Sequence, residues 1–246
     1  MIESLQNEKV KLYAKLNNKK YRNELNLFVA SGHHLVTEAL KKNIVKEILL
    51  LNGEENVYGN VTYVTSEILK KISGLDNAPK VLAICHKCQG QDIKGNVIML
   101  DDISDPGNLG TIIRTAVAFN YDTIILSSDT VDVYNPKVIR ATEGMIFHIN
   151  IIQDNLSSKI MELKDKGYLI YGTDVRGKSN IVLDKTKKHA LIIGSEASGI
   201  KKDLLSLCDV SLCIKINPNC ESLNAAVAAG ILMYELTIQS YSSVLQ

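Results

Sequence analysis

Short apolar runs and stretches of helical periodicity follow one another along the first third of the chain. The predicted strands are residues 27–30, 48–51, 61–64 and 81–85, and the predicted helices are residues 1–16, 33–41 and 66–72. Short apolar runs fit buried strands, and apolar residues at helical spacing fit one face of a helix. A basic turn is predicted at residues 17–22. This alternation of helix and strand is typical of a small α/β domain.

The same alternation continues from residue 96, with uninterrupted apolar strands. The predicted strands are residues 97–100, 123–126, 147–151, 168–172 and 191–193, and the predicted helices are residues 108–119, 136–141 and 156–166. Apolar strands joined by helices predict a parallel sheet that is covered on both faces. The polar stretch QGQDIKG has the composition of a linker. We therefore expect two α/β domains, residues 1–88 and 96–246, joined by residues 89–95.

Residues 213–236 combine an apolar strand, a polar turn and a helix that is rich in alanine. The strand is predicted at residues 213–216, and the turn contains Pro218. The small side chains of the helix indicate that another segment packs close to its backbone. Ser222 and Asn224 lie at the helix entrance, where free N–H groups and the positive end of the helix dipole bind polar or anionic groups. A plain helix cap is the alternative role for Ser222.

Polar residues also follow other predicted strands, at the edge where parallel sheets bind their ligands. Asn108 is a candidate helix cap, and Arg114 lies about two turns inside that helix among apolar neighbours. An arginine in this setting needs a salt bridge or a bound phosphate. Glu196 would repel a phosphate, which disfavours an NAD or nucleotide site. With Thr173, these residues predict a cleft for an uncharged or cationic small molecule beside an arginine that takes a phosphate.

The composition is that of a globular protein without a membrane span. The chain has 246 residues, of which 46% are hydrophobic and 22% charged. Its longest uncharged apolar run falls well short of the roughly 20 residues that cross a bilayer, and its N-terminus does not resemble a signal peptide. We expect a cytoplasmic protein. Cys85 and Cys88 resemble half of a zinc site, but no second pair of ligands follows, so no metal is expected.

The net charge of +1 conceals a basic patch near the N-terminus. Lys9, Lys19, Lys20 and Arg22 fall within the first 22 residues, where acidic residues are few. Such a patch suits an RNA backbone, because each neutralised phosphate releases counterions. A solvated helix face is the other interpretation of the same charges. The four residues are therefore RNA-binding candidates.

Three segments of the second domain together resemble the SpoU/TrmH family of RNA ribose 2′-O-methyltransferases, in the SPOUT superfamily. The segments are NLGTIIR at residues 108–114, IIGSEASG at residues 192–199 and ESLNAAVA at residues 221–228. The first domain resembles the L30e/L7Ae-like substrate-binding domain of that family. Asn7, Lys9, residues 19–22 and residues 28–36 carry this second resemblance, although Ser31 stands where the family usually has an acidic residue.

The resemblance implies a fold, a cofactor and a partner. It implies a trefoil knot near the C-terminus, a homodimer through the knotted region, RNA as substrate, and S-adenosylmethionine bound within the knot. The cofactor-binding residues that it implies are Gly194, Ile214 and Leu223, with Thr173 nearby. The chain departs from the family at residues 214–216, Ile-Lys-Ile in place of Ile-Pro-Met, and at Pro218 in place of glycine.

The resemblance also implies a reaction, in which a ribose 2′-oxygen attacks the sulfonium methyl group in line. Arg114 matches the catalytic arginine of the family. Because a guanidinium stays protonated, we expect it to hold the target phosphate and polarise the hydroxyl, not to act as a free base. The residues that orient Arg114 and the substrate, across the dimer interface, are Asn108, Glu196, Ser222 and Asn224.

Four functions remain in competition at this point. Ribosomal RNA is the favoured substrate, because the related tRNA enzymes generally lack the appended first domain. A tRNA methyltransferase is the second candidate, and a non-catalytic RNA-binding assembly factor is the third, opposed by the intact set of matched polar residues. An oxidoreductase is disfavoured by Glu196 and by the missing glycine fingerprint. Both a housekeeping modification and self-protection of the thiostrepton type fit the resemblance.

Overall fold

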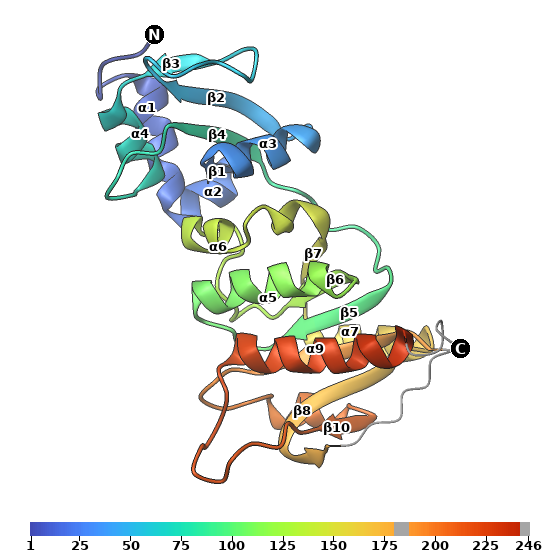
Figure 1. Ribbon diagram of the computed structural model, residues 1–246. Helices are drawn as coiled ribbons and strands as arrows, with labels where there is room; N and C mark the ends of the chain where they lie inside the picture. Colours follow the sequence, from blue (N-terminus) through green and yellow to red (C-terminus); the bar gives the residue numbers. More distant parts are fainter. Residues whose placement is uncertain (180–186, 242–246) are drawn as a thin grey trace. The chain divides into compact units, whose positions relative to one another are not determined.

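The computed structural model describes residues 1–179 and 187–241, with side chains to residue 237, and its contacts divide the chain into two compact units (Figure 1). Unit 1 consists of Met1–Cys88 and Asp132–Phe147, and unit 2 consists of Gln89–Val131 and His148–Gln246. The segment Asp132–Phe147 thus packs with the N-terminal residues, although the sequence places it within the second domain.

Unit 1 is built on a mixed four-stranded sheet with the order β1-β4-β2-β3. The strands are β1 (Leu27–Ser31), β2 (Val45–Leu51), β3 (Thr62–Val64) and β4 (Val81–His86). β4 runs antiparallel to both β1 and β2, while β2 and β3 are parallel. All four strands occur where the apolar runs predict them.

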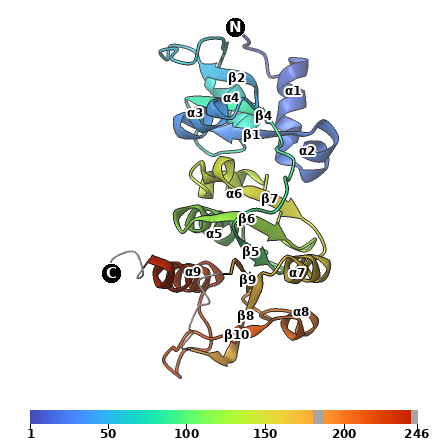
Figure 2. The same ribbon diagram turned by 90° about the vertical axis from the view of Figure 1, so that its right-hand side faces the viewer.

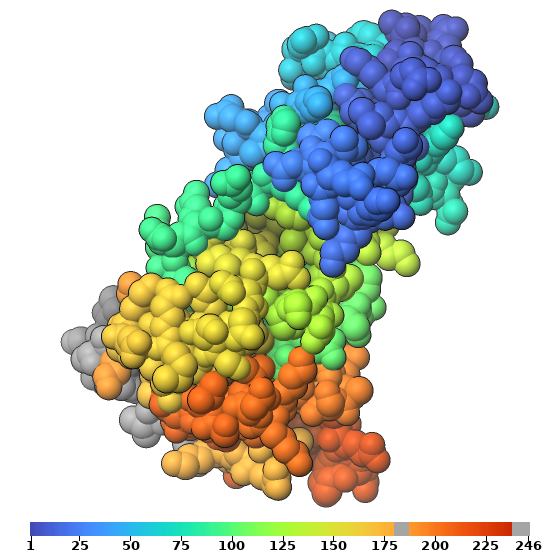
Figure 3. All heavy atoms as spheres, turned by 180° about the vertical axis from the view of Figure 1, so that it is seen from behind, coloured from blue at the N-terminus to red at the C-terminus, as the bar shows by residue number. Residues whose placement is uncertain are grey.

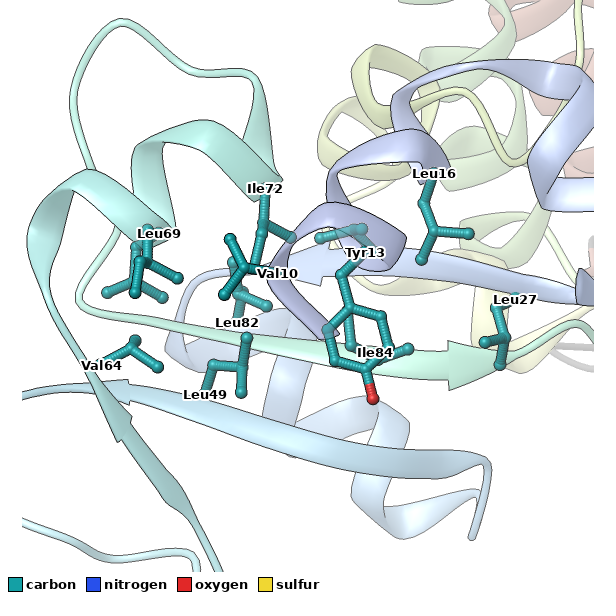
Figure 4. Packing of buried hydrophobic residues seen from close by; sticks show 12 residues of the cluster. Val10, Tyr13, Leu16, Leu27, Leu49, Val64, Leu69, Ile72, Leu82 and Ile84 are labelled. Carbon is teal, nitrogen blue, oxygen red and sulfur yellow. The ribbon is translucent and has the colours of Figure 1, made fainter. Parts of the chain in front are cut away.

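One face of this sheet is covered by the first and fourth helices. The helices and turns of the unit are α1 (Glu8–Ala14), η1 (Lys15–Asn17), α2 (Lys19–Leu25), α3 (His33–Lys41), α4 (Ser66–Ser73), α6 (Pro136–Ala141) and η2 (Met145–His148). In Figure 4, Val10 and Tyr13 of α1 lie over Leu82 and Ile84 of β4. The basic turn expected at residues 17–22 is instead largely the helix α2, because the Asn18 side chain accepts a hydrogen bond from Lys20 N and caps it.

The segment Asp132–Phe147 is joined to unit 1 by a buried ion pair and by aromatic packing. Arg22 is only 3% exposed and donates to Asp132 Oδ2 from Nη2 at 2.6 Å and from Nε at 2.9 Å. Its Nη1 donates to the carbonyl of Leu16 at 2.8 Å. The ring of Phe28, on β1, lies 4.9 Å from that of Tyr134. These contacts explain why the segment belongs to this unit.

Unit 2 contains a fully parallel sheet with the order β10-β8-β9-β5-β6-β7. The strands are β5 (Asn96–Leu100), β6 (Tyr121–Leu126), β7 (Asn150–Gln153), β8 (Leu169–Lys178), β9 (His189–Ile193) and β10 (Val210–Leu212). The predicted α/β architecture is confirmed. Two predicted strands are misplaced: the strand expected at 147–151 begins only at Asn150, because Met145–His148 form a 3-10 turn, and the one expected at 213–216 lies earlier, as β10.

Helices cover both faces of the parallel sheet. α5 (Pro106–Ala118) and α9 (Ala225–Tyr241) lie on one face, and α7 (Leu156–Asp165) and α8 (Lys202–Ser206) on the other (Figure 2). α9 packs against α5, and the small residue Gly230 faces Thr115 of that helix. The close packing expected for the alanine-rich helix is therefore a contact with α5. No helix within the described residues is long and apolar enough to cross a membrane.

A buried histidine makes the stability of unit 2 dependent on pH. His189, at the start of β9, is 7% exposed, and its Nε2 lies 2.8 Å from the hydroxyl of Tyr121. Burial raises the pKa of Tyr121, so the hydroxyl keeps its proton. Burial also lowers the pKa of His189 to about 4. The folded protein therefore holds a neutral imidazole, whereas the unfolded chain binds a proton near pH 6.5.

We expect the free energy of unfolding to fall as the pH drops from 6.5 to 4, because only the unfolded state takes up the proton of His189 in this window. Above pH 6.5 His189 is neutral in both states and does not lower the free energy of unfolding. By pH 4 its protonation in the unfolded state has lowered that free energy by about 3 kcal/mol. Urea denaturation at several pH values measures it. His189→Gln, which has no titrating group, is expected to show a shallower decline. Equal slopes for both proteins would contradict a neutral His189.

Candidate functional site

Three polar side chains from three separate segments meet at one carboxylate oxygen in unit 2. Glu196 follows β9, Asn108 lies in the first turn of α5, and Asn224 directly precedes α9. Glu196 Oε1 accepts from Asn108 Nδ2 at 2.8 Å, from Asn224 Nδ2 at 2.7 Å and from Ala225 N at 3.2 Å. Asn224 Nδ2 also donates to Asn108 Oδ1 at 2.9 Å. The sequence predicted all three as site residues, and the structure brings them into one cluster.

The hydrogen bonds of this cluster have one consistent direction. Asn224 Oδ1 accepts from the backbone N–H groups of Ala226 and Val227 at 3.0 and 3.3 Å, which caps α9 and fixes the orientation of the amide. Its Nδ2 must therefore donate to both neighbours. Glu196 Oε2 receives no hydrogen bond from the part of the chain that the structure describes, so one oxygen of the carboxylate is available to a ligand.

The cap of α5 is not the residue that the sequence suggested. Asp105 precedes the helix, and its Oδ1 accepts from Asn108 N at 2.8 Å, while Pro106 occupies the first helical position. Asn108 is therefore a residue of the first turn, and its side chain is left to bind Glu196. Aspartate followed by proline is a frequent helix start, and this signal identifies the cap correctly.

A cavity of about 430 Å³ adjoins the cluster, within unit 2. Its walls come from the end of β8, the loop after β9 and the segment between β10 and α9. The lining includes Thr173, Asp174, Ile193, Gly194, Glu196, Leu212, Ile214, Ser222, Leu223 and Leu232. All four predicted cofactor-binding residues lie in this wall. The wall also contains Arg176 and Lys202, so it combines apolar side chains with two carboxylates and two cations, which suits a small molecule with charged groups.

The loop after β9 is held by residues that sequence reasoning missed. Lys201 N donates to Asp101 Oδ2 at 2.9 Å, and Lys201 Nζ lies 2.9 Å from Asp129 Oδ2 and 3.5 Å from Asp101 Oδ1. Asp101 is 1% exposed, and the ammonium of Lys201 lowers the pKa of Asp129. Asp101 directly follows the buried strand β5, which is the sequence signal that marks such a residue. The anchor fixes the end of the loop that carries Glu196.

Arg114 and Ser222 are not part of the hydrogen-bonded cluster. Arg114 is exposed, and it forms no hydrogen bond or ion pair with any residue in 1–179 or 187–237. It lies six residues after Asn108, about 240° around α5. The structural salt bridge considered from the sequence is thus not formed within the described chain. Ser222 lines the cavity, and its carbonyl lies 3.2 Å from Cys220 Sγ.

A family model for the SpoU rRNA methylase family matches residues 95–234, which include the whole cluster and the cavity. The chain belongs to the SpoU rRNA methylase family. The resemblance drawn from the three segments is thereby confirmed, together with the enzyme class, an RNA 2′-O-methyltransferase. A second family model, for the MRM3-like substrate binding domain, matches residues 7–83.

Curated and solved relatives of this SpoU protein cover nearly its full length. It is 38% identical over 243 residues to the 23S rRNA (guanosine(2553)-2′-O)-methyltransferase RlmP of Bacillus subtilis strain 168, covering 96% of this chain and 98% of that protein. The AdoMet-bound rRNA methyltransferase from Sinorhizobium meliloti is 30% identical, with a TM-score of 0.85 and 96% of each chain covered. The AdoMet complex of AviRb from Streptomyces viridochromogenes, 23% identical, shares the fold with a TM-score of 0.85, covering 96% of this chain and 99% of that chain.

The four RNA-binding candidates of the SpoU protein differ in exposure and in ion pairing. Lys19 and Lys20 are exposed. Lys9 is exposed but ion-paired with Glu47 at 3.1 Å. Arg22 departs from the expectation, because it is buried and bound to Asp132, so its guanidinium is not available to a phosphate.

No group of three or more metal-ligating side chains occurs among the described residues. Cys85 is buried, and burial raises the pKa of its thiol, which disfavours the thiolate that binds zinc. Cys88 is exposed, and burial of its sulfur likewise raises the pKa.

Proposed function

We propose that this SpoU protein methylates a ribose 2′-hydroxyl of ribosomal RNA with S-adenosylmethionine as the methyl donor. The observation that carries the proposal is the convergence of Asn108, Glu196 and Asn224 beside a cavity of the size of a small-molecule site. The RlmP relative acts on 23S rRNA by its name, and it matches this chain from end to end. Both domains of an rRNA enzyme are therefore represented.

The cavity fits S-adenosylmethionine by size and by chemistry. Its volume lies in the range of small-molecule sites, and Ile193, Leu212 and Leu232 offer apolar surface to an adenine ring. The residues that hold it in this proposal are Thr173, Gly194, Ile214 and Leu223, of which Gly194, Ile214 and Leu223 contribute backbone groups. Glu196 offers a carboxylate to a positive charge, whereas Asp174 lies 3.6 Å from Arg176 Nε and is already paired. When bound, the cofactor supplies an electrophilic methyl group on a sulfonium.

Arg114 and the polar cluster have separate tasks in the proposed reaction. The guanidinium of Arg114 binds the phosphate of the target nucleotide and polarises the 2′-hydroxyl, which lowers the cost of passing its proton to solvent water as the oxygen takes up the methyl group. Asn108, Asn224 and Glu196 form a rigid wall that orients the target ribose, and Ser222 hydrogen-bonds at the mouth of the cavity. Proximity and orientation then supply most of the rate.

The proposal includes the trefoil knot and a homodimer through the knotted region. Two large apolar side chains of α9, Val227 and Tyr234, are 50% and 52% exposed. A second copy that covers them would stabilise the dimer by burying apolar surface. The exposed Arg114 would then reach the site of the partner copy. Analytical ultracentrifugation measures this association, and a monomer at micromolar concentration would contradict it.

Gly194→Ala is expected to abolish cofactor binding. A Cβ at this position would lie 2.1 Å from the carbonyl carbon of Gly199 and 2.2 Å from Ile200 N, so the loop that lines the cavity has to move. Isothermal titration with S-adenosylmethionine measures the effect. Gly167→Ala is the control, because Gly167 has a φ of +79° and no atom within 4 Å of the added carbon. Its strain lies outside the cavity and is expected to leave the affinity unchanged.

The proposed function is tested by measuring the transfer of labelled methyl groups from S-adenosylmethionine to unmodified rRNA and, separately, to unmodified tRNA. Label is expected in rRNA, in dinucleotides that resist alkaline hydrolysis, because a 2′-O-methyl group removes the hydroxyl that attacks the neighbouring phosphate. Label in tRNA alone would overturn the rRNA assignment. Label that alkali releases as mononucleotides would show that the methyl group is not on the ribose 2′-oxygen. Cofactor binding without transfer to naked or ribosome-bound rRNA would favour the RNA-binding assembly factor.

A further inference from the structure

A basic groove runs between α1 and α4 in unit 1. Val10 and Tyr13 are the buried residues of α1 and point toward the sheet, as Figure 4 shows. The lysines of α1 and η1 are not among the buried residues. The groove has a volume of about 690 Å³ and is lined by Glu8, Lys9, Lys11, Leu12, Ala14, Lys15 and Lys71. In Figure 3, dark-blue atoms near the N-terminus adjoin a teal area from the chain near residue 70.

The lining carries an excess of positive charge. Four lysines and one glutamate line the groove. Lys9 is paired with Glu47, and Lys11 lies 3.2 Å from the exposed Glu8. Lys15 and Lys71 form no ion pair within the described part of the chain, although Lys71 Nζ donates to the carbonyl of Leu5 at 3.4 Å. Lys15 lies in η1 and Lys71 in α4. Two unpaired ammonium groups across a groove are suited to an anionic chain between them.

An aromatic ring lies beside the same groove. Lys15 Nζ is 5.3 Å from the centre of the Tyr21 ring, and Lys20 Nζ is 6.0 Å from it. Tyr21 is half-buried and both ammonium groups lie over its ring, so a base that stacks on the ring takes the place of one of them. A basic groove with an adjacent aromatic ring is the combination that binds single-stranded nucleic acid, because phosphates follow the charges and a base stacks on the ring. An acidic polypeptide would use the charges but not the ring.

We propose that this groove binds the phosphate backbone of an unpaired RNA segment, with Tyr21 as a stacking surface for a base. Lys15 and Lys71 contact the phosphates from the two sides of the groove, and Leu12 contributes apolar floor. The proposal rests on the proposed function, since it assigns part of the RNA substrate to unit 1. It also replaces the buried Arg22 by Lys11, Lys15 and Lys71 as the basic residues that bind RNA.

The test compares two double variants that remove the same charge from the same unit. Lys15→Gln/Lys71→Gln removes both unpaired lysines of the groove, and Lys42→Gln/Lys46→Gln removes two exposed lysines outside it. Binding of fragmented unmodified rRNA is measured on the full chain over a series of salt concentrations. The groove variant is expected to bind on the order of tenfold more weakly and to lower the slope of log K against log salt by about 2. The control is expected to retain most of the wild-type affinity.

Tyr21 is tested by two substitutions that differ in the ring. Tyr21→Leu is expected to weaken RNA binding several-fold at all salt concentrations, and Tyr21→Phe, which keeps the ring, is expected to bind like the wild type. Equal affinities for Tyr21→Leu and Tyr21→Phe would overturn the stacking role. Unchanged melting temperatures establish that the variants fold.

The outcomes separate this inference from the proposed function. In the methyl-transfer assay, the groove variant is expected to raise KM for rRNA without lowering kcat or the affinity for S-adenosylmethionine. Groove and control variants that bind RNA equally would overturn the groove, even if the wild type methylates rRNA. Competition by polyglutamate as strong as that by RNA would overturn the assignment to RNA. If the wild type transfers no methyl group but the groove variant still binds RNA more weakly than the wild type, the proposed reaction would be overturned and the groove would stand.

Discussion

Arg114→Ala is expected to lower methyl transfer to rRNA by about 10²- to 10³-fold, because a positioned charge that stabilises the reacting oxygen contributes about this much to a rate. The melting temperature is expected to stay that of the wild type, since Arg114 is exposed and has no partner in the described chain. Arg114 is also absent from the cavity wall, so the affinity for S-adenosylmethionine is expected to be unchanged. Steady-state kinetics, thermal unfolding and cofactor titration measure the three quantities.

Arg114→Lys is the matched variant for this experiment. It keeps the positive charge but loses the planar group that binds a phosphate through two parallel hydrogen bonds. The activity of Arg114→Lys is therefore expected to lie between those of the wild type and Arg114→Ala. Its kcat is expected to change more than its KM for rRNA. A fall in melting temperature that parallels the loss of activity would show that Arg114 is structural and would contradict the proposed role.

Asp132→Ala is expected to destabilise unit 1 by about 3 to 5 kcal/mol, because it leaves the guanidinium of Arg22 buried without its counterion. Only the Leu16 carbonyl would still accept from that group. Urea denaturation, followed by far-UV circular dichroism, measures the loss. Glu24→Ala is the control, because Glu24 lies in α2 like Arg22 but forms only an exposed pair with Lys20, at 3.9 Å. Such a pair contributes well under about 1 kcal/mol.

The double variant Arg22→Met/Asp132→Leu distinguishes an unpaired charge from a simple loss of packing. Removing both partners leaves no buried charge, so most of the stability lost in Asp132→Ala is expected to return. Double and single variants of equal stability would contradict this explanation. They would indicate that the packing around Phe28 and Tyr134 holds Asp132–Phe147 instead.

The sequence predicted the parts of the fold that depend on local apolar patterns. The strands of both sheets and the long helices stand close to their expected positions, because each buries an uninterrupted run or one helical face. Two errors came from segments whose apolar residues serve another purpose. Ile214 and Ile216 line the cavity instead of continuing β10, and Phe147 packs on Phe28 within unit 1 instead of starting β7.

The candidate site was predicted unevenly for a similar reason. Glu196 follows a strand, Asn224 precedes a helix and Asn108 lies in the first turn of one, and their motifs were recognisable in the chain. The anchor between Asp101 and Lys201 was not recognisable, because it joins residues 100 positions apart through a backbone hydrogen bond and an ion pair. The burial of Arg22 was equally hidden, since its partner Asp132 lies 110 positions away in the chain.

The membership of Asp132–Phe147 in unit 1 has a consequence for dissecting or exchanging the two halves of the chain. A fragment that ends at Cys88 would lack Asp132, Tyr134 and Phe147, and would expose the apolar surface of Phe28 together with an unpaired arginine. A cut at residues 89–95 is therefore expected to leave unit 1 incomplete. A chimera that borrows specificity from a relative has to transplant residues 132–147 along with the N-terminal residues.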